Sequence, residues 1–150
     1  MAGASAIADA KAAEVSATFA RQGLLRTFGA EMTSLEAGRC TITTQFKEAV
    51  GQQHGFFHGG VVGAIADTAG GCAALTLLPL GSEVLTLEYK INFVRPAAGE
   101  KLVAEGTVLR AGKSICVTRV DVFVERSGER TLCAALQQSM MRAPTQPEDQ

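Results

Sequence analysis

Residues 52–60 read QQHGFFHGG, and residues 61–78 continue as VVGAIADTAGGCAALTLL. The second stretch predicts a long helix that is buried almost all round, because Asp67 is its only charged side chain. A buried carboxylate is costly unless it is paired, hydrogen-bonded or used in chemistry. Two glycines at the helix start, Gly59 and Gly60, leave backbone N–H groups bare, and such groups bind and polarise oxygen atoms. The combination predicts an active site.

Two structural interpretations of this stretch compete with that prediction. A transmembrane helix fits the length, but Asp67, the many glycines and alanines and the lack of a basic flank argue against it. A plain core helix that tolerates Asp67 stays open. The Gly59–Gly60 pair weighs against it, because glycines weaken a helix start unless the backbone must bend or stay bare.

Composition narrows the classes of function. The chain has 150 residues, which predicts one domain, and 14 basic against 15 acidic residues give a net charge of −1. That balance argues against a nucleic-acid partner and against a polybasic membrane patch. The four cysteines lie far from one another in apolar segments without metal-ligand spacing: Cys40, Cys72, Cys116 and Cys133. We expect buried free thiols, no metal site and, with no signal peptide at the N-terminus, a cytoplasmic protein.

Periodicity and turn residues predict an α+β protein. The order is an N-terminal helix, a hairpin, the long helix and four strands. The expected elements are a helix at 8–25, strands at 28–35 and 39–46, the long helix, and strands at 84–94, 101–111, 114–125 and 130–141. We expect flexible ends at 1–7 and 143–150. One antiparallel sheet wrapped around one long helix is the economical packing of these elements.

The strand at 84–94 alternates in polarity. Five apolar residues are predicted to share one face: Leu85, Leu87, Tyr89, Ile91 and Phe93. The same alternation places Thr86 on the opposite, polar face together with Glu88, Lys90 and Asn92.

Two motifs carry a resemblance to a known family. The string from Gln52 through His58-Gly59-Gly60 to Asp67, followed by TLEYKINFVRP at 86–96, resembles the PaaI-like acyl-CoA thioesterases of the hotdog superfamily. The likeness covers about residues 28–142. It implies the hotdog fold, in which an antiparallel sheet wraps around one long central helix. Here that fold carries an extra N-terminal helix.

The resemblance also implies an activity and a set of residues. Members of the family hydrolyse acyl-CoA thioesters, and CoA is part of the substrate, so no cofactor is expected. The family's catalytic acid corresponds to Asp67, and its oxyanion-binding glycine amide corresponds to Gly59. Its side-chain amide in the loop before the helix corresponds to Gln52, and its hydroxyl on the following strand corresponds to Thr86. Many relatives have Asn where this chain has Gln52. The glutamine keeps the amide group but has a side chain longer by one methylene, and the neighbouring Gln53 is an alternative for the same role.

Helix geometry adds a prediction about assembly. Asp67 can act as general base or as nucleophile, and the Gly59 N–H can stabilise the oxyanion. Eight residues at 1.5 Å rise separate the two by about 12 Å along one helix, so they cannot both touch one thioester carbon. We therefore expect a homodimer with two antiparallel helices and shared sites, an inactive monomer and further assembly into a tetramer.

Substrate-binding candidates are less specific. His58 and Gly60 lie at the helix start, where a histidine more often bonds to the backbone. Three basic residues could meet the phosphates of CoA, although isolated basic side chains at strand ends are usually only solvated: Arg95, Arg110 and Lys113. Cys72 is a poor nucleophile candidate because the sequence places no histidine beside it.

Two other functions remain open at this stage. One is a hotdog hydratase or dehydratase that acts on acyl-CoA or acyl-carrier-protein, and the other is a non-catalytic acyl-CoA-binding module. The position of Asp67 inside the helix favours hydrolysis over the first, and an acid retained beside an anionic ligand argues against the second. Aryl-CoA substrates such as phenylacetyl-CoA are favoured by resemblance, and medium-chain acyl-CoA substrates remain open.

Overall fold

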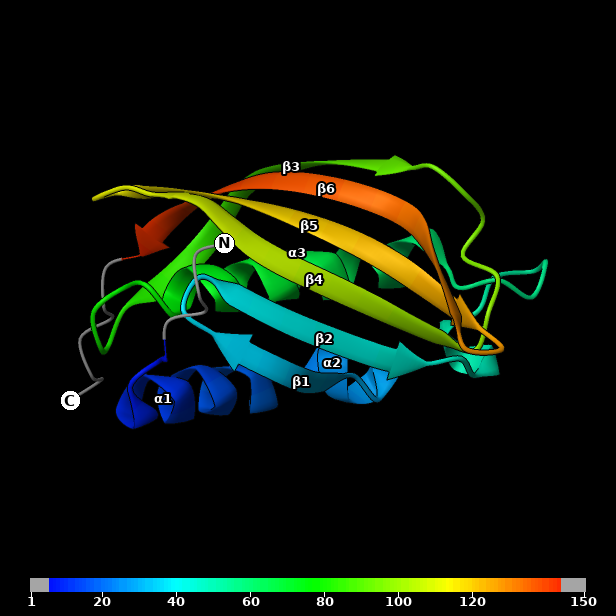
Figure 1. The fold of residues 1–150 in the computed structure, drawn as a ribbon, viewed down its shortest axis with the longest axis horizontal. Helices are drawn as coiled ribbons and strands as arrows, with labels where there is room; N and C mark the ends of the chain where they lie inside the picture. Colours follow the sequence, from blue (N-terminus) through cyan, green and yellow to red (C-terminus); the bar gives the residue numbers. More distant parts are fainter. Residues whose placement is uncertain (1–5, 144–150) are drawn as a thin grey trace.

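The computed structural model describes residues 6–143 (Figure 1). In chain order its elements are α1 (Asp9–Ala20), α2 (Gly23–Phe28), β1 (Glu31–Glu36), β2 (Arg39–Gln45), the 3₁₀ turn η1 (Glu48–Val50), α3 (Gly59–Leu75), β3 (Glu83–Phe93), β4 (Lys101–Ala111), β5 (Ile115–Arg126) and β6 (Glu129–Ala143).

The strands form one antiparallel sheet in the order β1-β2-β4-β5-β6-β3. Figure 1 shows this sheet curved over α3, with α1 and α2 near β1. The predicted α+β architecture, a sheet wrapped around one long helix, is confirmed. Within this sheet β3 lies at an edge and pairs only with β6.

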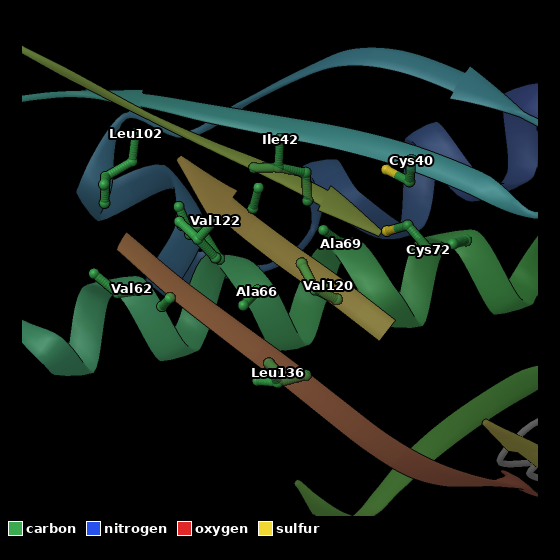
Figure 2. Packing of buried hydrophobic residues seen from close by; sticks show 14 of the residues in the cluster. Cys40, Ile42, Val62, Ala66, Ala69, Cys72, Leu102, Val120, Val122 and Leu136 are labelled. Atoms are coloured by element: carbon green, nitrogen blue, oxygen red, sulfur yellow. The ribbon is translucent and has the colours of Figure 1, made fainter. Parts of the chain in front are cut away.

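The contact between α3 and the sheet is close because small residues line it. Ala66 and Ala69 of α3 are fully buried and face Val120 and Leu136 of the sheet (Figure 2). A Cβ on Gly106 of β4 would lie 2.6 Å from the Ala69 carbonyl oxygen, so only glycine permits this approach. Small residues on the helix and on the sheet therefore allow α3 to lie close to the sheet.

One stripe along α3 is open, so the expectation that the helix is buried almost all round is wrong there. Gly60, Ala64, Asp67 and Gly71 are half-buried or exposed, and their spacing of four, three and four residues places them on one helical face. The rest of the helix from Val61 onward is buried. Asp67 is therefore a half-buried carboxylate on an open face.

The N-terminal region forms two helices where one was expected. α1 ends at Ala20, and α2 begins at Gly23, which has weak helix propensity. α2 continues to Phe28 and ends at Gly29 in the left-handed conformation (φ 68°), so the first strand begins at Glu31 and not at residue 28.

A β-bulge in β3 corrects the predicted faces of this strand. Thr86 pairs with Met140 and Glu88 pairs with Ser139, so Leu87 is an extra residue in the ladder. Met140 is fully buried, and the Ser139 hydroxyl donates to the Glu88 carboxylate on the outer face. Thr86 consequently faces α3, whereas uninterrupted alternation places it on the outer face with Glu88.

Several smaller predictions also have outcomes. The four cysteines are free and buried, as expected. β6 extends through Ala143, which pairs with Glu83, so the expectation of a flexible end from residue 143 is wrong at its first residue. Residues 6 and 7 of the other predicted end form no helix or strand, and residues 1–5 and 144–150 lie outside the described residues.

Candidate active site

Asp67 lies on the third turn of α3 and points toward the start of β3. Its Oδ1 atom accepts a hydrogen bond from the Thr86 hydroxyl at 2.7 Å. The bulge at Leu87 makes this contact possible, because it turns Thr86 toward the helix. Two residues predicted for the site are therefore brought together, and Thr86 holds the carboxylate in one orientation.

A cavity of about 420 Å³ opens beside this pair. Gly71, Cys72 and Leu75 of α3 continue its wall beyond Asp67, and the start of β3 forms the other side. The sequence reasoning missed the N-terminal contribution: Thr18 and Gln22 also line the cavity. The Thr68 hydroxyl donates to Gln22 Oε1 at 3.2 Å, which ties the connection between α1 and α2 to α3.

The start of α3 presents a free backbone donor. His58 is the N-cap, and its Nδ1 accepts a hydrogen bond from the Gly60 N–H at 2.9 Å. Among residues 6–143 the Gly59 N–H donates to no other group. The Phe93 ring covers Gly59, because a Cβ there would lie 3.3 Å from the ring. The Gly59 amide is thus available at the positive end of the helix, whereas the Gly60 amide is already satisfied.

A second cavity of about 360 Å³ surrounds this helix start. Gln52, Gly59, Phe93 and Arg95 line it together. The Gln52 side chain accepts from the His54 N–H, which orients the amide from within its own loop. Gln53 is exposed and does not line this cavity. Gln52, six residues before His58, therefore lies beside the helix start, and its role there stays a prediction.

The predicted site residues thus fall into two groups within one chain. Asp67 and Thr86 line the first cavity, and Gln52 and Gly59 line the second. Arg95 joins the second group, and its guanidinium also donates to the Leu132 carbonyl at 3.3 Å. The other two basic candidates, Arg110 and Lys113, are exposed at or beside the β4–β5 turn and line neither cavity.

Other chemistry is poorly supported in the described part of the chain. Cys72 borders the first cavity, but its side chain faces Cys40 across the core (Figure 2). Hydrogen bonding to Cys72 and burial raise the pKa of the Cys40 thiol far above its ordinary value. Between residues 6 and 143, no three His, Cys, Asp or Glu side chains form a metal-binding cluster, and no helix is long and apolar enough to cross a membrane.

Comparison with known proteins identifies the family. The family model of the thioesterase superfamily matches residues 54–131. The chain belongs to the thioesterase superfamily. A putative esterase of Saccharolobus solfataricus is 34% identical over 99 residues, which are 66% of this chain and 69% of the relative. The 1,4-dihydroxy-2-naphthoyl-CoA hydrolase of Listeria monocytogenes is 29% identical over 111 residues, which are 74% of this chain and 89% of that enzyme.

Solved structures agree with this assignment. A thioesterase family protein from Silicibacter pomeroyi has 35% sequence identity and a TM-score of 0.86, with 88% of this chain and 97% of that chain covered. The PaaI protein of Escherichia coli, from its phenylacetic acid degradation operon, shares the fold with a TM-score of 0.81 at 20% identity, over 93% of this chain and 98% of that chain. The resemblance to hotdog thioesterases is therefore confirmed, and this member of the superfamily is a thioester hydrolase.

Proposed function

We propose that this thioesterase hydrolyses acyl-CoA, releasing a free acid and CoA. The 1,4-dihydroxy-2-naphthoyl-CoA hydrolase among its relatives supports a CoA thioester, and an aryl or medium-chain acyl group fits a first cavity of about 420 Å³. Asp67 attacks the thioester carbon directly or removes a proton from the attacking water. Thr86 holds the carboxylate in position for either role.

The observation that carries the proposal is the separation of the two half-sites. Gly59 and Asp67 belong to one helix and are about 12 Å apart along its axis. Each lines a different cavity, and these cavities lie against opposite ends of β3. A thioester at Asp67 therefore needs its oxyanion donor from a second copy of the chain, which supports a shared site in a homodimer.

The edge strand β3 is the surface that best fits this second copy. Four of its large apolar residues are about half exposed or more: Leu85, Leu87, Tyr89 and Phe93. Exposed edge strands pair readily with other strands. A two-fold axis at Tyr89 would place Thr86 of one chain opposite Asn92 of the other. The cavity at Asp67 would then meet the cavity at the partner's helix start.

The open stripe of α3 fits the same arrangement. Gly60, Ala64 and Gly71 are small, so a second α3 that runs antiparallel can approach closely on the face that carries Asp67. The Gly59 N–H from the partner would stabilise the oxyanion, and the partner's Gln52 would orient the carbonyl or the water. Arg95, beside that cavity, is the basic residue best placed to meet a phosphate of CoA. Assembly of two such dimers into a tetramer remains a prediction.

A complementation experiment tests the shared site. One chain carries Asp67→Asn, and the other carries Gly59→Pro, which removes the N–H donor. Each homodimer should be inactive. A mixed dimer has one site with both lesions and one intact site, so random reassembly should recover about a quarter of wild-type activity.

Two controls make this experiment decisive. The Gly59→Pro chain must first be shown to fold by circular dichroism, because proline at a helix start requires a compatible φ. Mixed dimers must be demonstrated with two affinity tags, and activity is measured as release of free CoA thiol, which a hydratase would not produce. No recovery in proven mixed dimers would place the whole site within one chain.

A further inference from the structure

Two polar side chains lie in the otherwise apolar interface beneath Asp67. Gln138 of β6 and Thr118 of β5 are opposite each other in the sheet, and their exposed fractions are 1% and 0%. Within the described residues, Gln138 Oε1 and Thr118 Oγ1 have no hydrogen-bond partner. Unsatisfied buried oxygens destabilise a protein, and apolar residues of similar size would avoid that cost. The polar pair therefore needs a reason beyond packing.

The amide group of Gln138 makes a specific contact with the catalytic turn. Its Nε2 donates to the backbone carbonyl of Asp67 at 3.1 Å and also lies 3.2 Å from Met140 Sδ. In a regular α-helix that carbonyl accepts from the N–H of Gly71, four residues later. A carbonyl oxygen has two lone pairs, so Gln138 adds a second bond from the sheet.

The backbone around this contact is shaped to accept the polar pair. A Cβ on Gly70 would lie 2.6 Å from Thr118 Oγ1 and 2.9 Å from Gln138 Nε2. Gly70 therefore lets the helix rest directly on the two side chains. Gly70 and Gly71 also weaken the helix immediately after Asp67, because glycine has more conformational freedom than other residues. A hydrogen bond from outside the helix therefore stabilises this turn more than it would stabilise a turn without glycines.

We propose that Gln138 is a positioning residue for Asp67. Thr86 of β3 holds the carboxylate from one strand, and Gln138 of the neighbouring strand β6 holds the backbone of the same residue. Gln138 is too deeply buried to touch substrate, so it acts only through Asp67. The inference rests on the proposed catalytic role of Asp67.

Gln138→Leu tests the proposal, because it removes the donor at similar volume. We expect kcat to fall about tenfold while KM changes less than about twofold, since a misplaced catalytic group slows chemistry without weakening binding. The melting temperature should stay the same or rise, because a buried unsatisfied oxygen is removed. A purely structural role would instead lower stability together with activity.

Thr118→Val is the matched control. It deletes the other unsatisfied oxygen of the pair beside the same glycine but leaves the bond to Asp67 intact, so kcat should stay within about twofold of wild type. If Gln138→Leu does not fold, Gln138→Met serves as the second variant, with the same expected loss of kcat.

A double-mutant cycle separates this inference from the function on which it rests. If Gln138 acts through Asp67, Gln138→Leu should cause no further loss in an Asp67→Asn background. An equal loss in both backgrounds, or a kcat within twofold of wild type for Gln138→Leu alone, would overturn the positioning role. That result, combined with a large loss in Asp67→Asn, would leave the proposed function standing.

Discussion

The strands β3 and β5 have similar lengths and similar alternating sequences, but they are buried very differently. In β5 every second residue from Cys116 to Val124 is buried, because β4 and β6 flank the strand and α3 covers its inner face. No residue of β3 is buried, and only Val84 and Ile91 are half-buried. β3 therefore has more apolar side chains than the core of one chain buries.

This difference marks the surface at which we propose that a second copy of the chain completes the site. The central strand β5 supports the helix, whereas the edge strand β3 carries Thr86 and borders both cavities. A surface that combines unused apolar residues, unpaired backbone groups and site residues is best explained as one half of a larger site. The predictions below test that contrast between β3 and the rest of the sheet.

Asp67→Asn should have the largest effect. It keeps the size of the side chain but removes the base or nucleophile beside β3, so kcat should fall by about 10²-fold or more. The matched control is Asp121→Asn on β5, a half-buried carboxylate that pairs with Arg119 and should leave kcat unchanged. Thiol release measures both. Wild-type turnover in a folded Asp67→Asn protein would remove Asp67 from the mechanism.

Leu87→Lys should separate the chains. A charged side chain on an edge strand opposes pairing with a second copy, so the variant should be monomeric and lose about 10²-fold in activity. Leu109→Lys on β4 is the control, because Leu87 and Leu109 are each 54% exposed. Light scattering after size-exclusion chromatography gives the oligomeric state. A fully active Leu87→Lys monomer, or equal losses in both variants, would contradict the role of β3.

Gln52→Ala should reduce kcat/KM by roughly 10–100-fold, through loss of one orienting contact at the helix start. Gln53→Ala, one position later and outside the cavity, should be silent. Steady-state kinetics on one acyl-CoA compares the two directly. The reverse outcome would show that the register between this loop and the helix is off by one residue.

Much of this arrangement could be predicted because its signals are local. The Gly-rich entry and the apolar run after it predicted the helix, with Gly59 at its start and Asp67 inside it. Alternation and turn residues predicted six strands. The bulge at Leu87 could not be predicted, because an extra residue in a ladder leaves the composition of the strand unchanged. As a result, uninterrupted alternation assigned Thr86 to the wrong face.

The role of Gln138 was also invisible in the sequence. From residue 132 to residue 141 its strand reads as apolar residues mixed with two glutamines and a serine, and nothing local shows which glutamine faces the helix. Only the pairing with Thr118 and the height of α3 above the sheet place Gln138 beneath Asp67. Likewise, contacts between elements far apart in sequence bring Thr18 and Gln22 to the first cavity.

The smallest expected effect concerns the anchor at the start of β3. Glu14 of α1 accepts a hydrogen bond from the Gly81 N–H. Lys11 of the same helix also bonds to this loop, because it donates to the Pro79 carbonyl at 2.9 Å. The bond from Lys11 and the bond from Gly81 hold the pKa of the Glu14 carboxyl below its ordinary value of 4.5. A lowered pKa means that the ionised form stabilises the fold above about pH 4.5, and this stabilisation is lost as the pH falls through the folded-state pKa.

Glu14→Gln should therefore lower the melting temperature by about 2–4 °C at pH 7, the shift expected for about 1 kcal/mol in a chain of this size. The difference from wild type should shrink as the pH falls from 4.5 through the lower folded-state pKa, because the wild-type carboxyl becomes protonated over that range. Glu31→Gln, at an exposed glutamate that begins β1, controls for the loss of one negative charge and should leave the melting temperature unchanged. Thermal melts followed by circular dichroism at pH 7 and pH 3.5 measure both variants. A difference that persists undiminished at the lower pH would mean that the ionised carboxylate does not anchor the loop before β3.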